Sequence, residues 1–213
     1  MISRKINNAL NGNPNIPGDK SISHRSIIVP SISKGISKVS NILESDDVLC
    51  TLNAFKEMGV RIEKKNDNLV IFGNGLDSLK KPNNDLYLGN SGTSARLLAG
   101  LLATQNFKTT LTGDKSLSSR PMKRISDPLV SMNAKIETSN GCLPLTIIGS
   151  QLINKVIDIK IPSAQIKSGL ILAALNTNGI TKIIEHNITR DHTEIMLEAF
   201  NADIKISYNE SKK

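Results

Sequence analysis

Residues 17–25, which read PGDKSISHR, bring a turn, a lysine and the start of a helix close together. A proline and a glycine break the preceding segment, and Asp19 or Ser21 is expected to cap the helix that follows. A helix N-terminus carries unpaired N–H groups and a partial positive charge, which attract anions. Lys20 adds an ammonium, and Ser21 and Arg25 share a helix face because they are four residues apart. The motif favours an anion site, although a capped surface helix with two solvated cations explains it equally well when it stands alone.

A second polar cluster, residues 89–96 (GNSGTSAR), precedes an apolar helical stretch. Gly92 would let a ligand approach the backbone closely, and Arg96 follows on the next turn. The side-chain donors of this cluster are Asn90, Ser91 and Thr93. A glycine-containing helix cap without a ligand accounts for the motif about as well.

Three further segments carry cations or donors. Within residues 117–124 (LSSRPMKR), Arg120 lies just ahead of an expected helix, where its guanidinium could clamp a carboxylate or phosphate. Another helix is expected to open with Ser163, Ala164, Gln165 and Lys167, and a later turn holds Arg190, Asp191 and His192. Five clusters of this kind together favour an anion-binding function more strongly than any one of them.

One phrase recurs three times, at a spacing of about 70 residues: MGVRI at 58–62, MNAKI at 132–136 and FNADI at 200–204. In each copy an amphipathic helix is expected to end at a residue that accepts the left-handed conformation, and a short strand to follow. Those residues are Gly59, Asn133 and Asn201. The repetition predicts three structurally equivalent units.

Each unit is expected to contain a second helix upstream of that closing helix, at 23–29, 91–103 and 164–175. The pattern predicts an α/β domain with pseudo-threefold symmetry, made of three βαβαββ-like units at about 17–85, 86–150 and 151–213. The polar clusters lie at the starts of the upstream helices. If the symmetry axis gathers these helix N-termini, they create one volume that attracts a highly charged small anion.

The composition of the chain is that of a globular protein. Of 213 residues, 38% are hydrophobic and 22% are charged, as in ordinary globular proteins. The apolar runs are too short to span a bilayer and the N-terminal residues lack a secretory signal, so we expect a cytoplasmic protein without a membrane partner. The two cysteines lack metal-ligand spacing and are interpreted as reduced thiols.

The net charge of +8 indicates anionic partners. With no Trp, two Tyr, four Phe and no tract of Lys and Arg, the chain lacks the stacking platforms of single-strand binders. It also lacks helix-turn-helix and zinc-finger spacing. We therefore expect small anionic metabolites, not nucleic acid, as partners.

Six segments resemble, in order and spacing, the N-terminal half of the enolpyruvyl transferases, and within them the branch that acts on shikimate 3-phosphate. They are PGDKSISHR, NILESDDVLCTLNAFKEMGV, GNSGTSARLLAGLLA, LTGDKSLSSRPMKRISDPLVSMNA, SAQIKSGLILAAL and TRDHTEIMLEAFNA. Together they cover most of residues 17–204. Six ordered motifs are not expected by chance.

The resemblance implies transfer of the enolpyruvyl group of phosphoenolpyruvate to the 5-hydroxyl of shikimate 3-phosphate, with release of phosphate and without a metal or organic cofactor. By position in the matching motifs, shikimate 3-phosphate would be bound by Lys20, Ser21, Arg25, Ser163, Ala164, Gln165 and Arg190. Phosphoenolpyruvate would be bound by Lys20, Gly92, Arg120 and Gln165, with Asn90, Thr93 and Arg96 as candidates for support. Lys20 would also be catalytic, by stabilising charge or moving a proton.

Members of this family have two similar domains, and the resemblance covers one of them. Residues 1–16 are interpreted as a remnant of a strand of the second domain, and residues 17–213 as the N-terminal half domain. We therefore expect a half-site that turns over only with a complementary C-terminal half. The alternatives are a non-catalytic anion-binding relic and, disfavoured by the DKSISHR motif, a transferase that acts on UDP-N-acetylglucosamine.

Overall fold

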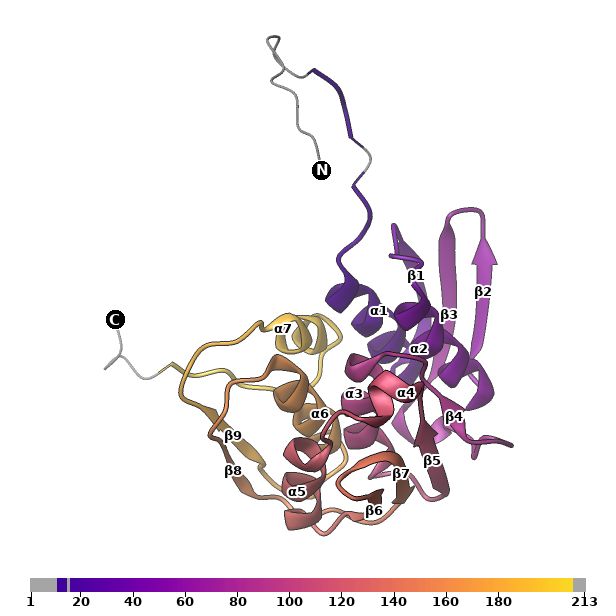
Figure 1. The fold of residues 1–213 in the computed structure, drawn as a ribbon. Coiled ribbons are helices and arrows are strands. Elements are labelled where there is room, and N and C mark those ends of the chain that lie inside the picture. Colours follow the sequence, from indigo (N-terminus) through magenta and orange to yellow (C-terminus); the bar gives the residue numbers. More distant parts are fainter. Residues whose placement is uncertain (1–10, 15, 209–213) are drawn as a thin grey trace, which may run out of the picture.

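Figure 1 shows the computed structural model of the chain, which describes residues 11–14 and 16–208. Helices and small sheets alternate along the chain, which confirms the predicted α/β class. Residues 11–14 and 16 form no helix or strand, and the rest of the segment interpreted as a remnant of a second domain lies outside the described residues. None of the helices in the described part of the chain is long and apolar enough to cross a membrane.

Residues 86–150 form a sheet of four strands, in the order β4-β5-β7-β6, with its helices packed beside it. β4 pairs in parallel with β5, and the other neighbours are antiparallel. The elements are β4 (Leu86–Tyr87), α3 (Gly92–Leu102), β5 (Lys108–Thr112), the short α4 (Lys115–Ser118), α5 (Lys123–Ser131), β6 (Lys135–Ser139) and β7 (Cys142–Ile148). Apart from α4, this is the βαβαββ order expected of one repeat.

Residues 17–85 form a similar unit with a sheet of three antiparallel strands, in the order β1-β3-β2. Its elements are α1 (Lys20–Ile32), β1 (Lys34–Ser40), α2 (Asp46–Glu57), β2 (Arg61–Lys65), β3 (Asn68–Asn74) and a 3-10 turn, η1 (Leu76–Ser78). The first strand of the βαβαββ order has no counterpart here among the described residues.

Residues 151–208 form the third unit, in which β8 pairs in parallel with β9. Its elements are β8 (Val156–Ile159), α6 (Ala164–Ala174), β9 (Lys182–Glu185) and α7 (His192–Ala199). The prediction of a strand after the third FNADI helix end is wrong for the described residues, because residues 203–208 belong to no strand. A strand needs a hydrogen-bonded neighbour, and none of the described strands pairs with this segment.

The three predicted helix ends share one geometry. Gly59, Asn133 and Asn201 have φ values of 86°, 74° and 59°, so all three are left-handed, as predicted. In each copy the next residue donates its N–H to the carbonyl five residues back, at 3.0, 3.0 and 2.9 Å. This bond satisfies a carbonyl that the end of the helix would otherwise leave unpaired. The three helix ends are therefore equivalent in backbone structure.

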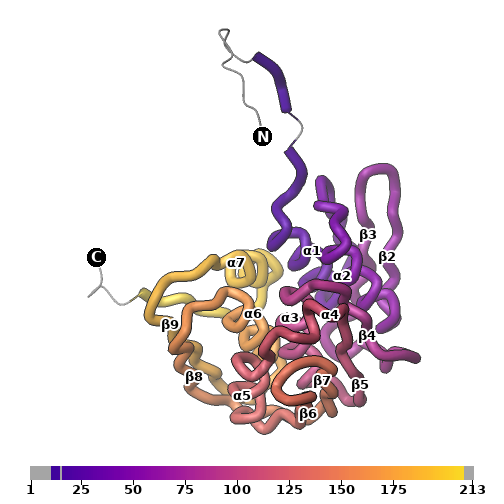
Figure 2. The backbone as a smooth tube through the Cα atoms, in the orientation of Figure 1, coloured from indigo at the N-terminus to yellow at the C-terminus, as the bar shows by residue number. Residues whose placement is uncertain are grey.

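The three upstream helices α1, α3 and α6 form the centre of the molecule, with the sheets outside them (Figure 2). α3 is almost wholly buried, and its four leucines have no exposed surface. α3 and α6 cross at Gly100 and Gly169, where a Cβ on Gly100 would overlap the Gly169 carbonyl oxygen. This close crossing packs α3 directly against α6.

We expect Gly100→Ala to lower the free energy of unfolding by about 1–3 kcal/mol, because the added methyl group forces the helices apart. The gain of up to about 1 kcal/mol from the better helix propensity of alanine does not offset this overlap. Urea unfolding measures the difference. Gly12→Ala is the control, since a Cβ there meets nothing within 4 Å and should leave stability unchanged.

Candidate functional site

The first turns of α1, α3 and α6 are capped in the same way. Asp19 Oδ1 accepts the N–H of Ile22 at 2.8 Å, so Asp19, not Ser21, caps α1. Ser91 caps α3 and Ser163 caps α6 through equivalent bonds of 3.1 and 3.4 Å. Each cap uses one of the N–H groups of its first turn, and the remaining ones keep their capacity to bind an anion.

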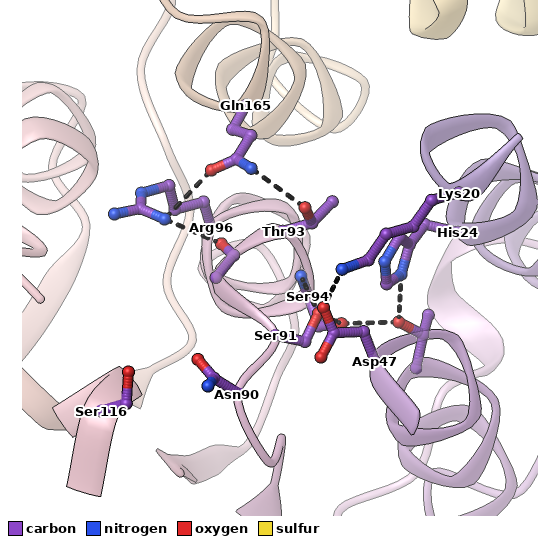
Figure 3. Close-up of polar contacts among 12 residues, drawn as sticks. Lys20, His24, Asp47, Asn90, Ser91, Thr93, Ser94, Arg96, Ser116 and Gln165 are labelled. Atoms are coloured by element: carbon purple, nitrogen blue, oxygen red, sulfur yellow. Dashed lines mark hydrogen bonds and ion pairs between the residues drawn. The ribbon is translucent and has the colours of Figure 1, made fainter. Parts of the chain in front are cut away.

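Side chains of the first turns of α3 and α6 bond to each other (Figure 3). Arg96 Nη1 donates to Gln165 Oε1 at 3.0 Å, and Gln165 Nε2 donates to Thr93 Oγ1 at 3.0 Å. Arg96 also donates to the Gly92 carbonyl at 3.1 Å. Burial, with the nearby Arg120 and Arg124, lowers the pKa of Arg96. The two helix openings therefore form one continuous polar surface that carries unneutralised positive charge.

Gly92 lies between two guanidinium groups. A Cβ at this position would come within 2.7 Å of Arg96 Nη1 and 3.2 Å of Arg120 Nη1. Arg120 in turn donates to Asn90 Oδ1 and, at 3.4 Å, to Ser116 Oγ. The absence of a side chain at Gly92 leaves room between two cations at a helix N-terminus, where a carboxylate or phosphate group would be bound favourably.

Arg25 joins α1 to α6 and α7 from a buried position, with 3% of its surface exposed. Its Nε donates to Thr193 Oγ1 at 2.5 Å, its Nη2 to Ser168 Oγ at 2.6 Å and its Nη1 to the Ser21 carbonyl at 2.8 Å. Burial is the main cause of its lowered pKa. Each Nη keeps a further N–H, so Arg25 can fix the helices and still attract an anion.

Arg190 brings a second guanidinium to the start of α1, since its Nη1 donates to Ser21 Oγ at 3.3 Å. Lys20, the first residue of α1, forms an ion pair with Asp47 in the first turn of α2 (Figure 3). Half of the Lys20 side chain remains exposed. Lys20, Ser21, Arg25 and Arg190 therefore lie around one helix opening.

Lys167 differs from the other cations of the helix starts. It is buried and forms ion pairs with Glu194 at 2.7 Å and Glu185 at 3.1 Å. Burial acts to lower its pKa, but the two carboxylates outweigh burial and the pKa is raised. Glu185 also accepts the N–H and hydroxyl of Thr189, both at 2.9 Å. Lys167 therefore helps to shape the turn before Arg190 instead of offering charge to a ligand.

The structure brings the sequence-predicted residues together in two linked groups. The α3–α6 opening holds Asn90, Gly92, Thr93, Arg96, Arg120, Ser163, Ala164 and Gln165, and the α1 opening holds Lys20, Ser21, Arg25 and Arg190. Sequence reasoning missed Thr51, Ser168 and Thr193, whose buried hydroxyls bond to residues of the site or of the helices that carry it. The available signal was a polar residue on an otherwise apolar helix face. Among the described residues no group of three or more His, Cys, Asp or Glu side chains is arranged to hold a metal ion.

The fold is of the α/β class and its helix openings are lined with cations, and comparison with known proteins gives the family. The sequence model of EPSP synthase (3-phosphoshikimate 1-carboxyvinyltransferase) matches residues 4–212. A relative named 3-phosphoshikimate 1-carboxyvinyltransferase from Ruthia magnifica is 52% identical over 206 residues, which are 96% of this chain and 47% of the relative. One from Oenococcus oeni is 51% identical over 199 residues, 92% of this chain and 45% of the relative.

A solved structure of EPSP synthase from Acinetobacter baumannii superposes with a TM-score of 0.89 at 49% identity, covering 92% of this chain and 45% of that one. The chain belongs to the EPSP synthase family. It spans about half the length of the curated relatives it matches.

We expect the stability of the protein to fall as the pH is lowered from about 6.5 to 4. Burial, with the nearby Lys20 ammonium, lowers the pKa of His24 from 6.5 to about 4. Over this pH range the unfolded chain takes up a proton at His24 and the folded chain does not. The free energy of unfolding therefore falls by about 3 kcal/mol. Urea unfolding at several pH values checks this. His24→Asn should show a shallower pH slope, and an unchanged slope would contradict the buried neutral imidazole.

Proposed function

We propose that this chain supplies the half-site that binds shikimate 3-phosphate and phosphoenolpyruvate for enolpyruvyl transfer. In that reaction the 5-hydroxyl of shikimate 3-phosphate loses its proton and its oxygen adds to the enol carbon of phosphoenolpyruvate, while the methylene carbon takes up a proton. The resulting methyl group then loses a proton as the bond from the former enol carbon to the phosphate oxygen breaks, which restores the double bond and releases phosphate. The observation that carries the proposal is the convergence of three capped helix N-termini with Lys20, Arg25, Arg96, Arg120 and Arg190. Membership of the EPSP synthase family supports it.

Two anions need two adjacent pockets with separate donors. The α1 opening, with Ser21, Arg25 and Arg190, suits the phosphate of shikimate 3-phosphate. The gap at Gly92, beside Arg96 and Arg120, suits phosphoenolpyruvate. Gln165 bonds to the α3 side and begins α6, so it can contact both ligands. Fixed donors of this kind offset the repulsion between two anions held side by side.

Lys20 is the proposed catalytic residue. It begins α1 and reaches α2, where its ammonium pairs with Asp47. An arriving anion would compete with Asp47 for this charge, and the ammonium could then stabilise negative charge on the reacting group. Transfer of a proton by Lys20 stays a prediction.

Turnover is proposed to need groups beyond those that this chain contributes. The curated relatives are about twice as long as the matched region, so half of their residues have no counterpart in these 213. A complementary C-terminal half is the partner expected to supply them. The cytoplasmic location and the absence of a nucleic-acid partner stay predictions. A non-catalytic anion-binding relic would share the same openings, and release of phosphate from phosphoenolpyruvate and shikimate 3-phosphate in the presence of a complementary C-terminal half separates the two, because a relic would bind without turnover.

We expect Lys20→Ala to weaken shikimate 3-phosphate binding by about tenfold to a hundredfold, because a hydrogen bond to a charged group contributes about 1.5–3 kcal/mol. Isothermal titration calorimetry on the purified chain measures the affinity. Lys135→Ala removes an exposed lysine of β6 outside the site and should leave the affinity unchanged. Absence of binding by the parent chain, or equal weakening in both variants, would contradict the proposed site.

A further inference from the structure

A buried chain of four side chains joins the openings of α1 and α3, and the proposed function gives it no role. His24 Nδ1 lies 2.7 Å from Thr51 Oγ1, which lies 2.6 Å from Ser94 Oγ. Ser94 Oγ lies 2.6 Å from Ser91 Oγ. All four residues have no exposed surface. We call His24, Thr51, Ser94 and Ser91 the buried relay; it runs from α1 through α2 to α3 (Figure 3).

The hydrogen bonds of the buried relay depend on one another. A hydroxyl between two partners donates to one and accepts from the other, so the direction of the whole chain follows the tautomer of His24. Its last member, Ser91, accepts the Ser94 N–H and caps α3. Removing the Thr51 hydroxyl would therefore break two buried bonds and leave His24 Nδ1 without a partner among the described residues, which costs more than the loss of an exposed hydrogen bond.

The two ends of the buried relay lie beside residues assigned to ligands. His24 follows Lys20 by one turn of α1, and Ser91 stands between Asn90 and Gly92 at the start of α3. The middle of the relay, Thr51, is one turn after Asp47, the partner of Lys20. Any shift of the first turn of α3 relative to Lys20 must therefore stretch this chain of bonds.

A histidine at this buried position, His24, is destabilising, and packing alone does not explain why one is present. Its Nε2 is buried and has no hydrogen-bond partner among the described residues. An unpaired buried polar atom destabilises a protein, and a leucine of similar size would avoid this loss. The imidazole is neutral at ordinary pH, because burial and Lys20 lower its pKa to about 4. It can therefore pair with the Thr51 hydroxyl as donor or as acceptor.

We propose that His24 and Thr51 are positioning residues, which hold Gly92 and Thr93 in register with Lys20 so that both sides of the phosphoenolpyruvate pocket meet one ligand. They touch no substrate and act through Ser94 and Ser91. The identity of the ligand rests on the proposed function, whereas the link between the helices rests on the geometry of the buried relay.

The test is Thr51→Val, which keeps the shape of the side chain and removes its hydroxyl. We expect the dissociation constant for phosphoenolpyruvate, measured by calorimetry, to rise about fivefold to tenfold, the effect of about one hydrogen bond. That for shikimate 3-phosphate should change less than about twofold, because Ser21, Arg25 and Arg190 are fixed by other bonds. Thr109→Val is the matched control, since Thr109 is buried and its hydroxyl has no partner among the described residues.

A second variant pair separates positioning from packing. His24→Asn can place an amide group near the position of Nδ1 and should keep most of the phosphoenolpyruvate affinity, whereas His24→Leu should lose it as Thr51→Val does. Combining His24→Leu with Thr51→Val should add little to either change, because both break the same chain. A loss that is equal for both ligands, or additive in the double variant, would show a general structural role and overturn the proposal.

Amide hydrogen exchange provides a readout that needs no ligand. Thr51→Val should speed exchange at the Ser94 amide, which the buried relay holds on Ser91, while Thr109→Val should not. If the parent chain binds neither ligand, the proposed function fails, and exchange alone decides whether the relay fixes α3. Unchanged exchange at Ser94 would overturn the positioning role whatever the ligand affinities are.

Discussion

The fold must hold several cations close together without cancelling their charge. Coulomb repulsion between them is strongest where water is excluded. Within the described residues, Arg25, Arg96, Arg120 and Arg190 bond to carbonyl, amide and hydroxyl oxygens and form no ion pair. Neutral acceptors fix a guanidinium and leave its charge for an incoming anion. The positive charge of these guanidinium groups is therefore not neutralised within the described part of the chain.

Helix packing and buried hydrogen bonds bring these cations and the helix N-termini together. The glycine crossing of α3 on α6 and the buried bonds of Arg25 bring three helix N-termini to one place, and their dipoles add to the field of the side chains. Charge is neutralised where it would not serve a ligand, as the two glutamates around Lys167 show. Lys20 is intermediate, since its single partner Asp47 lies at the rim of the site and an anion could displace it.

Local features of the fold could be predicted from the sequence, and distant contacts could not. The left-handed ends at Gly59, Asn133 and Asn201 depend on neighbouring residues, so their residue types were sufficient, whereas the sequence left Asp19 and Ser21 open as the cap of α1 and the structure shows Asp19. The motif predicts that Arg25 binds the substrate, but it does not predict its hydrogen-bond partners Ser168 and Thr193, which are 143 and 168 residues away in the sequence. The strand expected after Asn201 failed for the same reason, because strand formation depends on a neighbour that helix-end signals do not specify.

The most direct test of the account is nuclear magnetic resonance of the arginine Nε–H groups during titration with shikimate 3-phosphate. The account predicts that the signals of Arg25 and Arg190, and the backbone amides of Ser21 and Ala164, shift together with one dissociation constant, while Arg61, on β2 outside the site, stays unchanged. Shifts spread over many surface arginines, or none at Arg25 and Arg190, would contradict a site formed at these helix openings.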